Sequence, residues 1–193
     1  MSDQLKKNSA QEYFISFIKK NSKLLIGIIS IALLVFSISI FFNNKEKNKN
    51  ILVSEQFNQA KILIQNNKNN EAKIILEKIV AEKNKFYSPL SLYLLIDKEI
   101  ETNNKKIIIL FDKILLIKKI DEEDINLIKI KKALFLSDSE NEQLLLDTLN
   151  PIINSDSIWN KKAAKYLSNY FFQKGEKSKS NEYRKIFKGM SKK

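Results

Sequence analysis

The chain has 193 residues and a net charge of +12, with neither cysteine nor histidine, which excludes disulfides, thiol nucleophiles, histidine general bases and the common zinc sites. Only 3 Gly and 2 Pro occur, so sheets with many tight turns are disfavoured and we expect an all-α protein. Every basic residue except Arg184 is lysine, and a nucleic-acid interface built without arginine is unusual. We therefore expect no nucleic-acid partner.

An uncharged apolar run, residues 24–42, follows a short N-terminal tail, residues 1–23. As a helix the run reaches about 28 Å, close to the hydrocarbon thickness of a bilayer. Its interruptions are all small, which lipid tolerates: Gly27, Ser30, Ser37 and Ser39. The run is longer than a signal-peptide core, and no small-residue cleavage site follows it. We expect a retained transmembrane signal anchor; a buried core helix and a cleaved signal are the alternatives.

The charges around this run do not fix its orientation. The tail carries five lysines and the first twenty residues after the run carry four, a bias too small for the positive-inside rule. The apolar patch at 13–18 either lies in the membrane interface or extends the anchor helix. Residues 43–50 are polar, and we expect them to form a short spacer or the frayed end of a helix.

From residue 51 onward, apolar residues recur at helical spacing and polar segments interrupt them. The predicted helices are 51–64, 72–80, 88–101, 105–118, 121–136, 141–149, 157–173 and 177–188. Ser88 and Pro89 are expected to open the third helix, and Pro151 to end the sixth.

Paired in order, these helices make hairpins that start near residues 51, 89, 122 and 157. The starts are 38, 33 and 35 residues apart, close to the ~34-residue period of a tetratricopeptide array. Residues 76–80 and 111–115 also match in character. We therefore expect residues 51–193 to form a tetratricopeptide-like α-solenoid of about four hairpins. The small residue of the pattern is Ala60 in the first hairpin, and we place Leu95 at the corresponding position of the second.

The layout of tail, membrane helix and repeat domain, with Trp159, residues 167–168, the turn at 173–177 and Tyr183, resembles the YfgM-type ancillary subunit of the bacterial Sec translocon. The resemblance covers nearly the whole chain in layout. It implies a single-pass inner-membrane protein with a cytoplasmic N-terminus and a periplasmic domain. It also implies the Sec translocon and periplasmic chaperones as protein partners.

No residue pattern indicates catalysis. The densest carboxylate cluster is Asp121, Glu122, Glu123 and Asp124, but it contains no glycine and lacks the spacing of calcium loops. Acidic residues suit the first turn of a helix, so we interpret the cluster as a helix start. Paired carboxylates in a pocket and glycine-rich phosphate loops are also missing. We expect no enzyme, cofactor, metal or small-molecule substrate.

Most of the aromatic side chains in the repeat domain are expected to pack between stacked hairpins. The tetratricopeptide pattern implies a concave surface made by the first helix of each pair, and this groove would accept an extended peptide or a partner helix. The expected groove residues are Phe57, Lys61, Ile64, Leu92, Ile96, Glu99, Lys165, Asn169 and Phe172.

The residues thus favour a membrane-anchored protein-binding scaffold, and the resemblance implies that it faces the periplasm. A scaffold facing the cytosol remains the first alternative, since charge does not orient the anchor. The second alternative is a lipid-surface binder, because residues 174–193 hold eight basic residues against Glu176 and Glu182.

Overall fold

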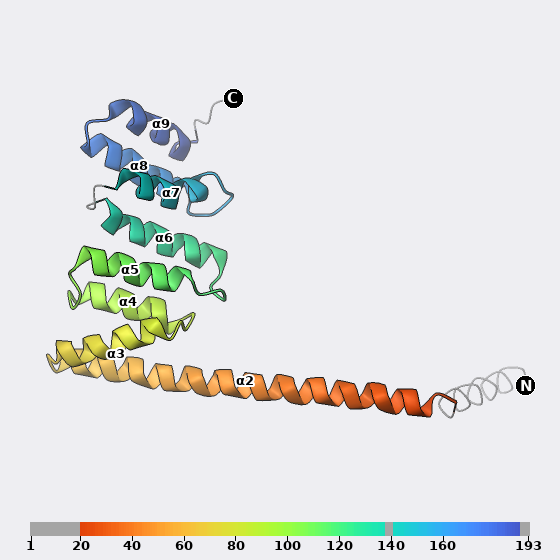
Figure 1. The fold of residues 1–193 in the computed structure, drawn as a ribbon. Coiled ribbons are helices and arrows are strands. Elements are labelled where there is room, and N and C mark those ends of the chain that lie inside the picture. The colour runs from red at the N-terminus through yellow and green to blue at the C-terminus, as the bar shows by residue number, and fades with distance from the viewer. Residues whose placement is uncertain (1–19, 138–140, 190–193) are drawn as a thin grey trace, which may run out of the picture. The chain divides into compact units, whose positions relative to one another are not determined.

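The structure is a computed structural model that describes residues 20–137 and 141–189. All its elements in these ranges are helices, which confirms the all-α class. They are α2 (Ser22–Gln65), α3 (Asn69–Ala81), α4 (Tyr87–Asp97), α5 (Asn104–Leu115), α6 (Glu122–Leu136), α7 (Glu142–Ile153), α8 (Asn160–Gln173) and α9 (Lys177–Phe187), shown in Figure 1. The chain divides into two compact units, Met1–Ile51 and Leu52–Lys193.

The first unit contains the N-terminal part of α2. Residues 43–50 are helical, because their lysine, glutamate and asparagine residues include neither Gly nor Pro to interrupt the helix. By length and hydropathy, no helix in the described part of the chain qualifies as a membrane span. Six positions of the predicted anchor, 25, 26, 28, 29, 30 and 42, have side chains outside the described set. The patch at 13–18 lies outside the described residues as well.

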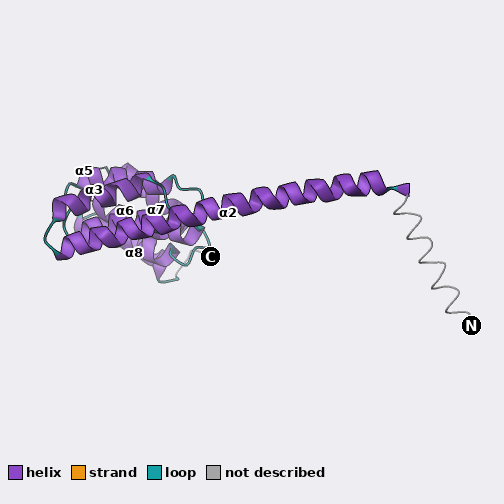
Figure 2. Ribbon diagram, turned by 90° about the horizontal axis from the view of Figure 1, so that it is seen from below, coloured by secondary structure: helices purple, strands orange, loops and turns teal. Residues whose placement is uncertain are grey.

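The second unit is a stack of helices in chain order, as Figure 1 shows; Figure 2 gives the view from below, in which these helices overlap. Its first hairpin joins residues 52–65 of α2 to α3, and the others are α4 with α5, α6 with α7 and α8 with α9. Each helix from α3 onward packs against the next one along the chain. Among the described residues, the helices of this unit therefore pack in chain order.

Three of the four first helices end in the same backbone turn. The turn residue has a positive φ: Asn67 (60°), Glu99 (52°) and Gly175 (80°). The N–H of the following residue donates to the carbonyl four residues before the turn residue, over 2.9 Å each: Lys68 to Leu63, Ile100 to Leu95 and Glu176 to Phe171. This is the Schellman arrangement of a helix end. The turn residues therefore give a structural register for the repeats.

In this register, the residue seven positions before the turn lies at the interface between helices of the stack. Ala60, Leu92 and Ser168 occupy this position, and all three are buried. In the last hairpin the two helices are hydrogen-bonded directly at this position: Ser168 Oγ donates to the Ser180 carbonyl (2.9 Å) and Ser180 Oγ donates to the Ser168 carbonyl (2.8 Å). The structural counterpart of Ala60 in the second hairpin is thus Leu92, not Leu95. The sequence comparison aligned the second helices of the two hairpins. It missed this correspondence because the loop after Glu99 is longer than the loop after Asn67, so the first helices are related by a different shift.

The start of α4 differs from the prediction. Asn84, not Ser88, caps this helix, because the Asn84 side-chain oxygen accepts from the N–H groups of Phe86 (3.0 Å) and Tyr87 (2.9 Å). Ser88 is buried and its hydroxyl donates to the Ile79 carbonyl at 2.7 Å. Ser88 therefore ties α4 to α3.

The end of α7 also differs, because the helix continues through Pro151 to Ile153. Proline in a helix costs about 3 kcal/mol through its missing N–H and its ring. Ile152 and Ile153 are both buried, and each buried isoleucine contributes about 1.5–3 kcal/mol. Burial of the two side chains offsets the proline, so Pro151 does not end the helix.

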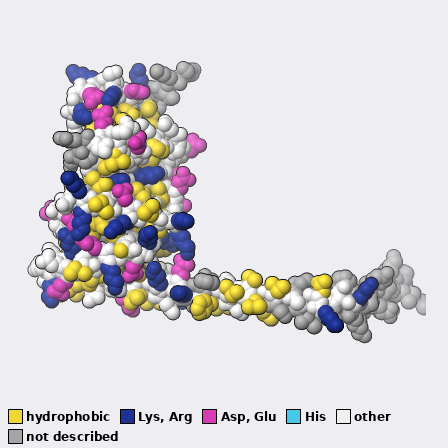
Figure 3. Space-filling view, in the orientation of Figure 1, with side chains coloured by type: hydrophobic (Ala, Val, Ile, Leu, Met, Phe, Trp, Pro, Cys, Tyr) yellow, Lys and Arg dark blue, Asp and Glu magenta, His cyan; other side chains and the backbone are white. Residues whose placement is uncertain are grey.

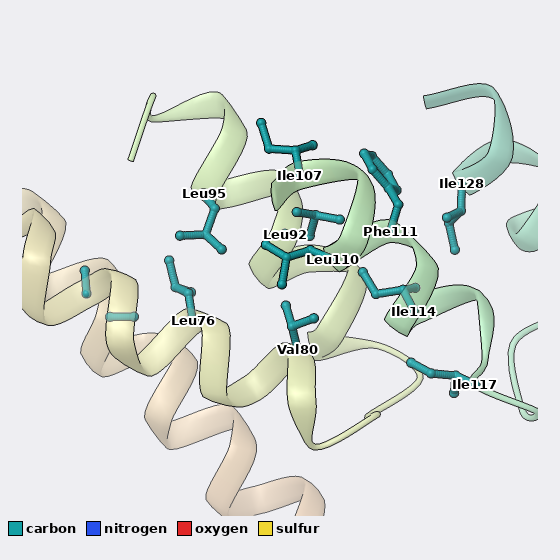
Figure 4. Packing of buried hydrophobic residues seen from close by; sticks show 12 residues of the cluster. Leu76, Val80, Leu92, Leu95, Ile107, Leu110, Phe111, Ile114, Ile117 and Ile128 are labelled. Carbon is teal, nitrogen blue, oxygen red and sulfur yellow. The ribbon is translucent and has the colours of Figure 1, made fainter. Parts of the chain in front are cut away.

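Buried side chains form two clusters in the second unit. One joins the first two hairpins to α6, and Figure 4 shows its side chains, among them Leu76, Leu92 and Phe111, between the helices. The other joins α6 to α9 around Leu167 and Phe171.

Tyrosines connect neighbouring hairpins, each reaching 33 residues back along the chain. Tyr87 Oη donates to Ser54 Oγ (2.8 Å), Tyr166 Oη to the Ala133 carbonyl (3.1 Å) and Tyr183 Oη to Asn150 Oδ1 (3.2 Å). Tyr87 and Tyr166 thus lie between hairpins as predicted, whereas Phe86 and Phe172, each 59% exposed, do not.

Candidate protein-binding hollow

An open pocket of about 470 Å³, called the hollow below, lies in the second unit. The residues that line it are Phe57, Leu90, Tyr93, Leu94, Ile96, Asp97, Phe111, Lys131, Leu134 and Phe135. They come from α2, α4 and α6, which are the first helices of three successive hairpins, with Phe111 from α5. This is the surface on which the repeat pattern places a groove.

The walls of the hollow are largely apolar and open to solvent. Leu90 on α4 is 47% exposed and Leu134 on α6 is 50% exposed. A bound molecule that covers two large aliphatic side chains removes them from water. This burial stabilises the complex by roughly 25 cal/mol per Å² of apolar surface. Figure 3 shows apolar side chains between charged ones on one face of this unit.

The floor of the hollow is firmly packed. Phe111 is fully buried, and its ring lies 5.8 Å from the ring of Phe135. The ring of Phe57, another lining residue, lies 5.6 Å from that of Tyr87. Tilted aromatic pairs at such distances add about 0.5–1.5 kcal/mol beyond their area burial. The hollow is therefore preformed by the core and not by a loop.

The polar groups of the hollow are few. The Lys131 ammonium lies 4.2 Å from the ring centroid of Tyr93, a cation–π distance. Burial, and to a lesser extent the charge of Asp124, raises the pKa of Tyr93 to about 12, so its phenol is neutral at physiological pH. Asp97 pairs with Lys98 at 3.1 Å. The charged side chains that line the hollow are thus one lysine and one aspartate.

Two of the nine predicted groove residues, Phe57 and Ile96, line the hollow. Ile64 is half-buried against the core beside them, and Lys61 is exposed on α2. Leu92 is fully buried, while Glu99 is exposed in the turn after α4. The remaining three lie on the exposed surface of α8 and do not line the hollow: Lys165, Asn169 and Phe172.

The register of the turn residues explains the displaced positions in α4. Glu99 follows Asn67 by 32 residues, so Lys61 and Ile64 correspond to Tyr93 and Ile96. The sequence comparison used a shift of 35 residues and therefore matched Phe57, Lys61 and Ile64 to Leu92, Ile96 and Glu99. In the structural register, Tyr93 and Ile96 both line the hollow.

Sequence reasoning missed the leucines that give the hollow its apolar character. Leu90 and Leu94 are four residues apart and so share one face of α4. Leu134 comes from α6, a helix from which no groove residue was predicted. One sequence signal was available for α4. A helix that buries one face needs apolar residues on that face only, but α4 has apolar side chains on more than one face.

The acidic cluster at 121–124 is a helix start, as predicted. The Asp121 side chain accepts from the N–H of Glu123 at 3.0 Å and caps α6. Within the described residues, no group of three or more His, Cys, Asp or Glu side chains is arranged to hold a metal ion.

No family model, curated protein or solved structure matches this chain.

Proposed function

We propose that this chain is a membrane-anchored scaffold whose helical-repeat domain binds another protein. The observation that carries the proposal is the open apolar hollow on the first helices of three hairpins. Helical grooves of this kind accept a partner helix or an extended peptide by burying apolar side chains. Anchoring confines the domain to two dimensions and raises the effective concentration of a partner in the same membrane.

The apolar part of α2 supports the anchor. Ile31, Leu33, Leu34, Val35 and Phe36 are all exposed. At about 100° per residue, these side chains point in all directions around the helix. A coiled-coil partner covers one seam of a helix, whereas lipid surrounds it. The distribution therefore favours a lipid environment for the run 24–42.

The resemblance to the YfgM-type subunit supplies the more specific version of the proposal. In that version the anchor lies in a bacterial inner membrane, the repeat domain faces the periplasm, and the partners are the Sec translocon and periplasmic chaperones. A scaffold with the same fold facing the cytosol is the alternative. The side of the membrane decides which partners the hollow can reach.

Topology is measurable because the chain has no cysteine. Single-cysteine variants Ser178→Cys in the repeat domain and Ser2→Cys in the tail are treated with a membrane-impermeant maleimide in intact spheroplasts. We expect labelling of Ser178→Cys and protection of Ser2→Cys, with both labelled after lysis. The reverse pattern would assign the domain to the cytosol, and labelling of both in intact cells together with release by carbonate would contradict the anchor.

Partner binding is tested by co-purification of the tagged full chain in mild detergent. Leu134→Lys places a charge in the hollow, and Ile109→Lys is the matched control, because Ile109 is 54% exposed but does not line the hollow. We expect translocon or chaperone subunits to be enriched with the wild type and the control, and lost with Leu134→Lys. Equal enrichment with all three proteins would exclude the hollow as the binding surface.

A second function, attachment to an anionic lipid surface, is favoured by one face of α9. Lys177 and Arg184 on α9 and Lys188 at its C-cap are exposed and lie within about 40° of one another around the helix axis. Such a stripe suits anionic headgroups at about 1 kcal/mol per residue near the surface. A dye on Ser178→Cys in nanodiscs with and without anionic lipid reports this contact. A signal insensitive to lipid charge and salt would exclude it.

A further inference from the structure

Lys131 is a half-buried cation in an apolar pocket. Its ammonium rests over the ring of Tyr93 at 4.2 Å, and it forms no ion pair with any residue that the structure describes. Lys131 and Leu134 are three residues apart on α6 and both line the hollow. The ammonium is therefore held beside exposed apolar surface.

Two other sheltered lysines of the domain, Lys73 and Lys132, are paired with carboxylates. Lys73 lies 3.0 Å from the buried carboxylate of Glu101, and the buried Lys132 lies 2.6 Å from Asp112. Partly desolvated cations are costly unless a carboxylate or several acceptors offset the loss of water. Lys131 has a π face in place of a carboxylate, which leaves its donor hydrogens available to a bound molecule.

We propose that the hollow takes an acidic amphipathic segment of a partner protein, with one carboxylate of the segment paired to Lys131. Its apolar side chains contact Leu90 and Leu134, and the carboxylate beside them reaches the ammonium over Tyr93. This inference rests on the proposed protein-binding function and names the chemistry of the bound segment.

The second charge of the hollow favours a peptide over a polyanion. Asp97 lines the same hollow and is exposed. A lipid surface or a nucleic acid would bring several negative charges to this carboxylate as well as to Lys131. A peptide can place one carboxylate at Lys131 and a neutral or basic residue near Asp97. Apolar walls also match leucine and phenylalanine side chains better than headgroups or sugars.

The test uses labelled probe peptides and the full chain in mild detergent. One probe is an amphipathic peptide with a leucine and phenylalanine stripe flanked by glutamates. The second carries glutamine at each glutamate, and the third carries lysine. Fluorescence anisotropy gives the Kd of each probe for the wild type, Lys131→Met and Lys113→Met. Methionine keeps the packing on Tyr93, and Lys113 is an exposed lysine on α5 that does not line the hollow.

We expect Lys131→Met to weaken the glutamate probe about tenfold, which corresponds to about 1.4 kcal/mol, and to leave the glutamine probe unchanged. Lys113→Met should leave both unchanged. Equal binding of glutamate and glutamine probes to the wild type would overturn the carboxylate pairing while leaving peptide binding intact. Preference for the lysine probe would also overturn it. Binding of no probe would reject both this inference and the hollow as a peptide site. If the full chain instead self-associates and Leu134→Lys abolishes this, the hollow binds a second copy of the chain and the inference is wrong.

Discussion

Replacing Gly175 by alanine should destabilise the last hairpin by about 1 kcal/mol. Gly175 has φ of 80°, and a Cβ built at this position meets no atom within 4 Å. The cost is therefore conformational and not steric. A left-handed conformation costs a non-glycine residue about 1–2 kcal/mol. Alanine also lowers the conformational entropy of the unfolded chain, which stabilises the folded state by about 0.4–1 kcal/mol. The difference leaves a net loss of about 1 kcal/mol.

Trp159 provides the assay, because it is the single tryptophan and packs against the cluster that joins α6 to α9. Urea unfolding of the full chain in mild detergent, followed by tryptophan fluorescence, reports the hairpin that contains Gly175. Gly175→Asn should lose about half as much as Gly175→Ala, since asparagine tolerates the left-handed region. Ser178→Ala, an exposed control within α9, should be neutral or slightly stabilising.

The reasoning fails if Gly175→Ala unfolds at the same urea concentration as the wild type. It also fails if asparagine and alanine are equally destabilising, because a steric cause would then replace the conformational one.

Three further substitutions test the repeat domain. Glu99→Gly should stabilise the second hairpin by about 0.5–1 kcal/mol in denaturation followed by circular dichroism, because Glu99 adopts φ of 52°; any destabilisation would refute this. Burial alone would raise the pKa of Glu101, but hydrogen bonds from Lys73 and the neighbouring backbone lower it to about 2. Because the pKa of Glu101 is lower in the folded state, its contribution to stability is complete above about pH 5 and is lost as pH falls toward 2. Glu101→Gln should therefore remove about 1–3 kcal/mol of pH-dependent stability across that range. An unfolding free energy whose dependence on acid pH is the same in the variant and the wild type would contradict this prediction. Asp112→Ala should cost about 1–3 kcal/mol because it leaves the Lys132 ammonium buried and unpaired, and adding Lys132→Met should recover most of the loss; a double variant as unstable as the single one would exclude this cause.

Features that depend on local chemistry were predictable from the sequence. Asp121 and the acidic residues after it marked the start of α6, because a side-chain oxygen and negative charge both suit a helix N-terminus. The all-α class followed from helical periodicity and the scarcity of Gly and Pro. The turn at Gly175 was also visible, since glycine favours the conformation that it adopts there.

Features that depend on neighbouring elements were predicted less well. Pro151 was expected to end its helix, but burial of Ile152 and Ile153 outweighs the local penalty. The positive φ values of Lys83 and Glu99 carry no sequence signal, because neither residue type favours the left-handed region. Without Glu99 as a marker, the second hairpin was aligned three residues out of register.

The candidate site divides in the same way. Phe57 and Ile96 were placed on the groove by the repeat pattern, and both line the hollow. Leu90 and Leu134 were not placed on the groove, because the sequence pattern of a helix does not distinguish an apolar residue that a neighbouring helix covers from one that stays exposed. Whether it stays exposed depends on where the adjacent hairpin packs.

The sequence by itself determined the all-α class, the approximate positions of the helices and the apolar run at 24–42, because these follow from the periodicity and composition of short segments. Only the tertiary structure decided which faces of those helices remain open. It placed Lys131 over Tyr93 beside Leu134, a grouping that requires α4 and α6 to pack at one distance and one rotation. Contacts between residues far apart in the chain set that rotation, and no local segment encodes it.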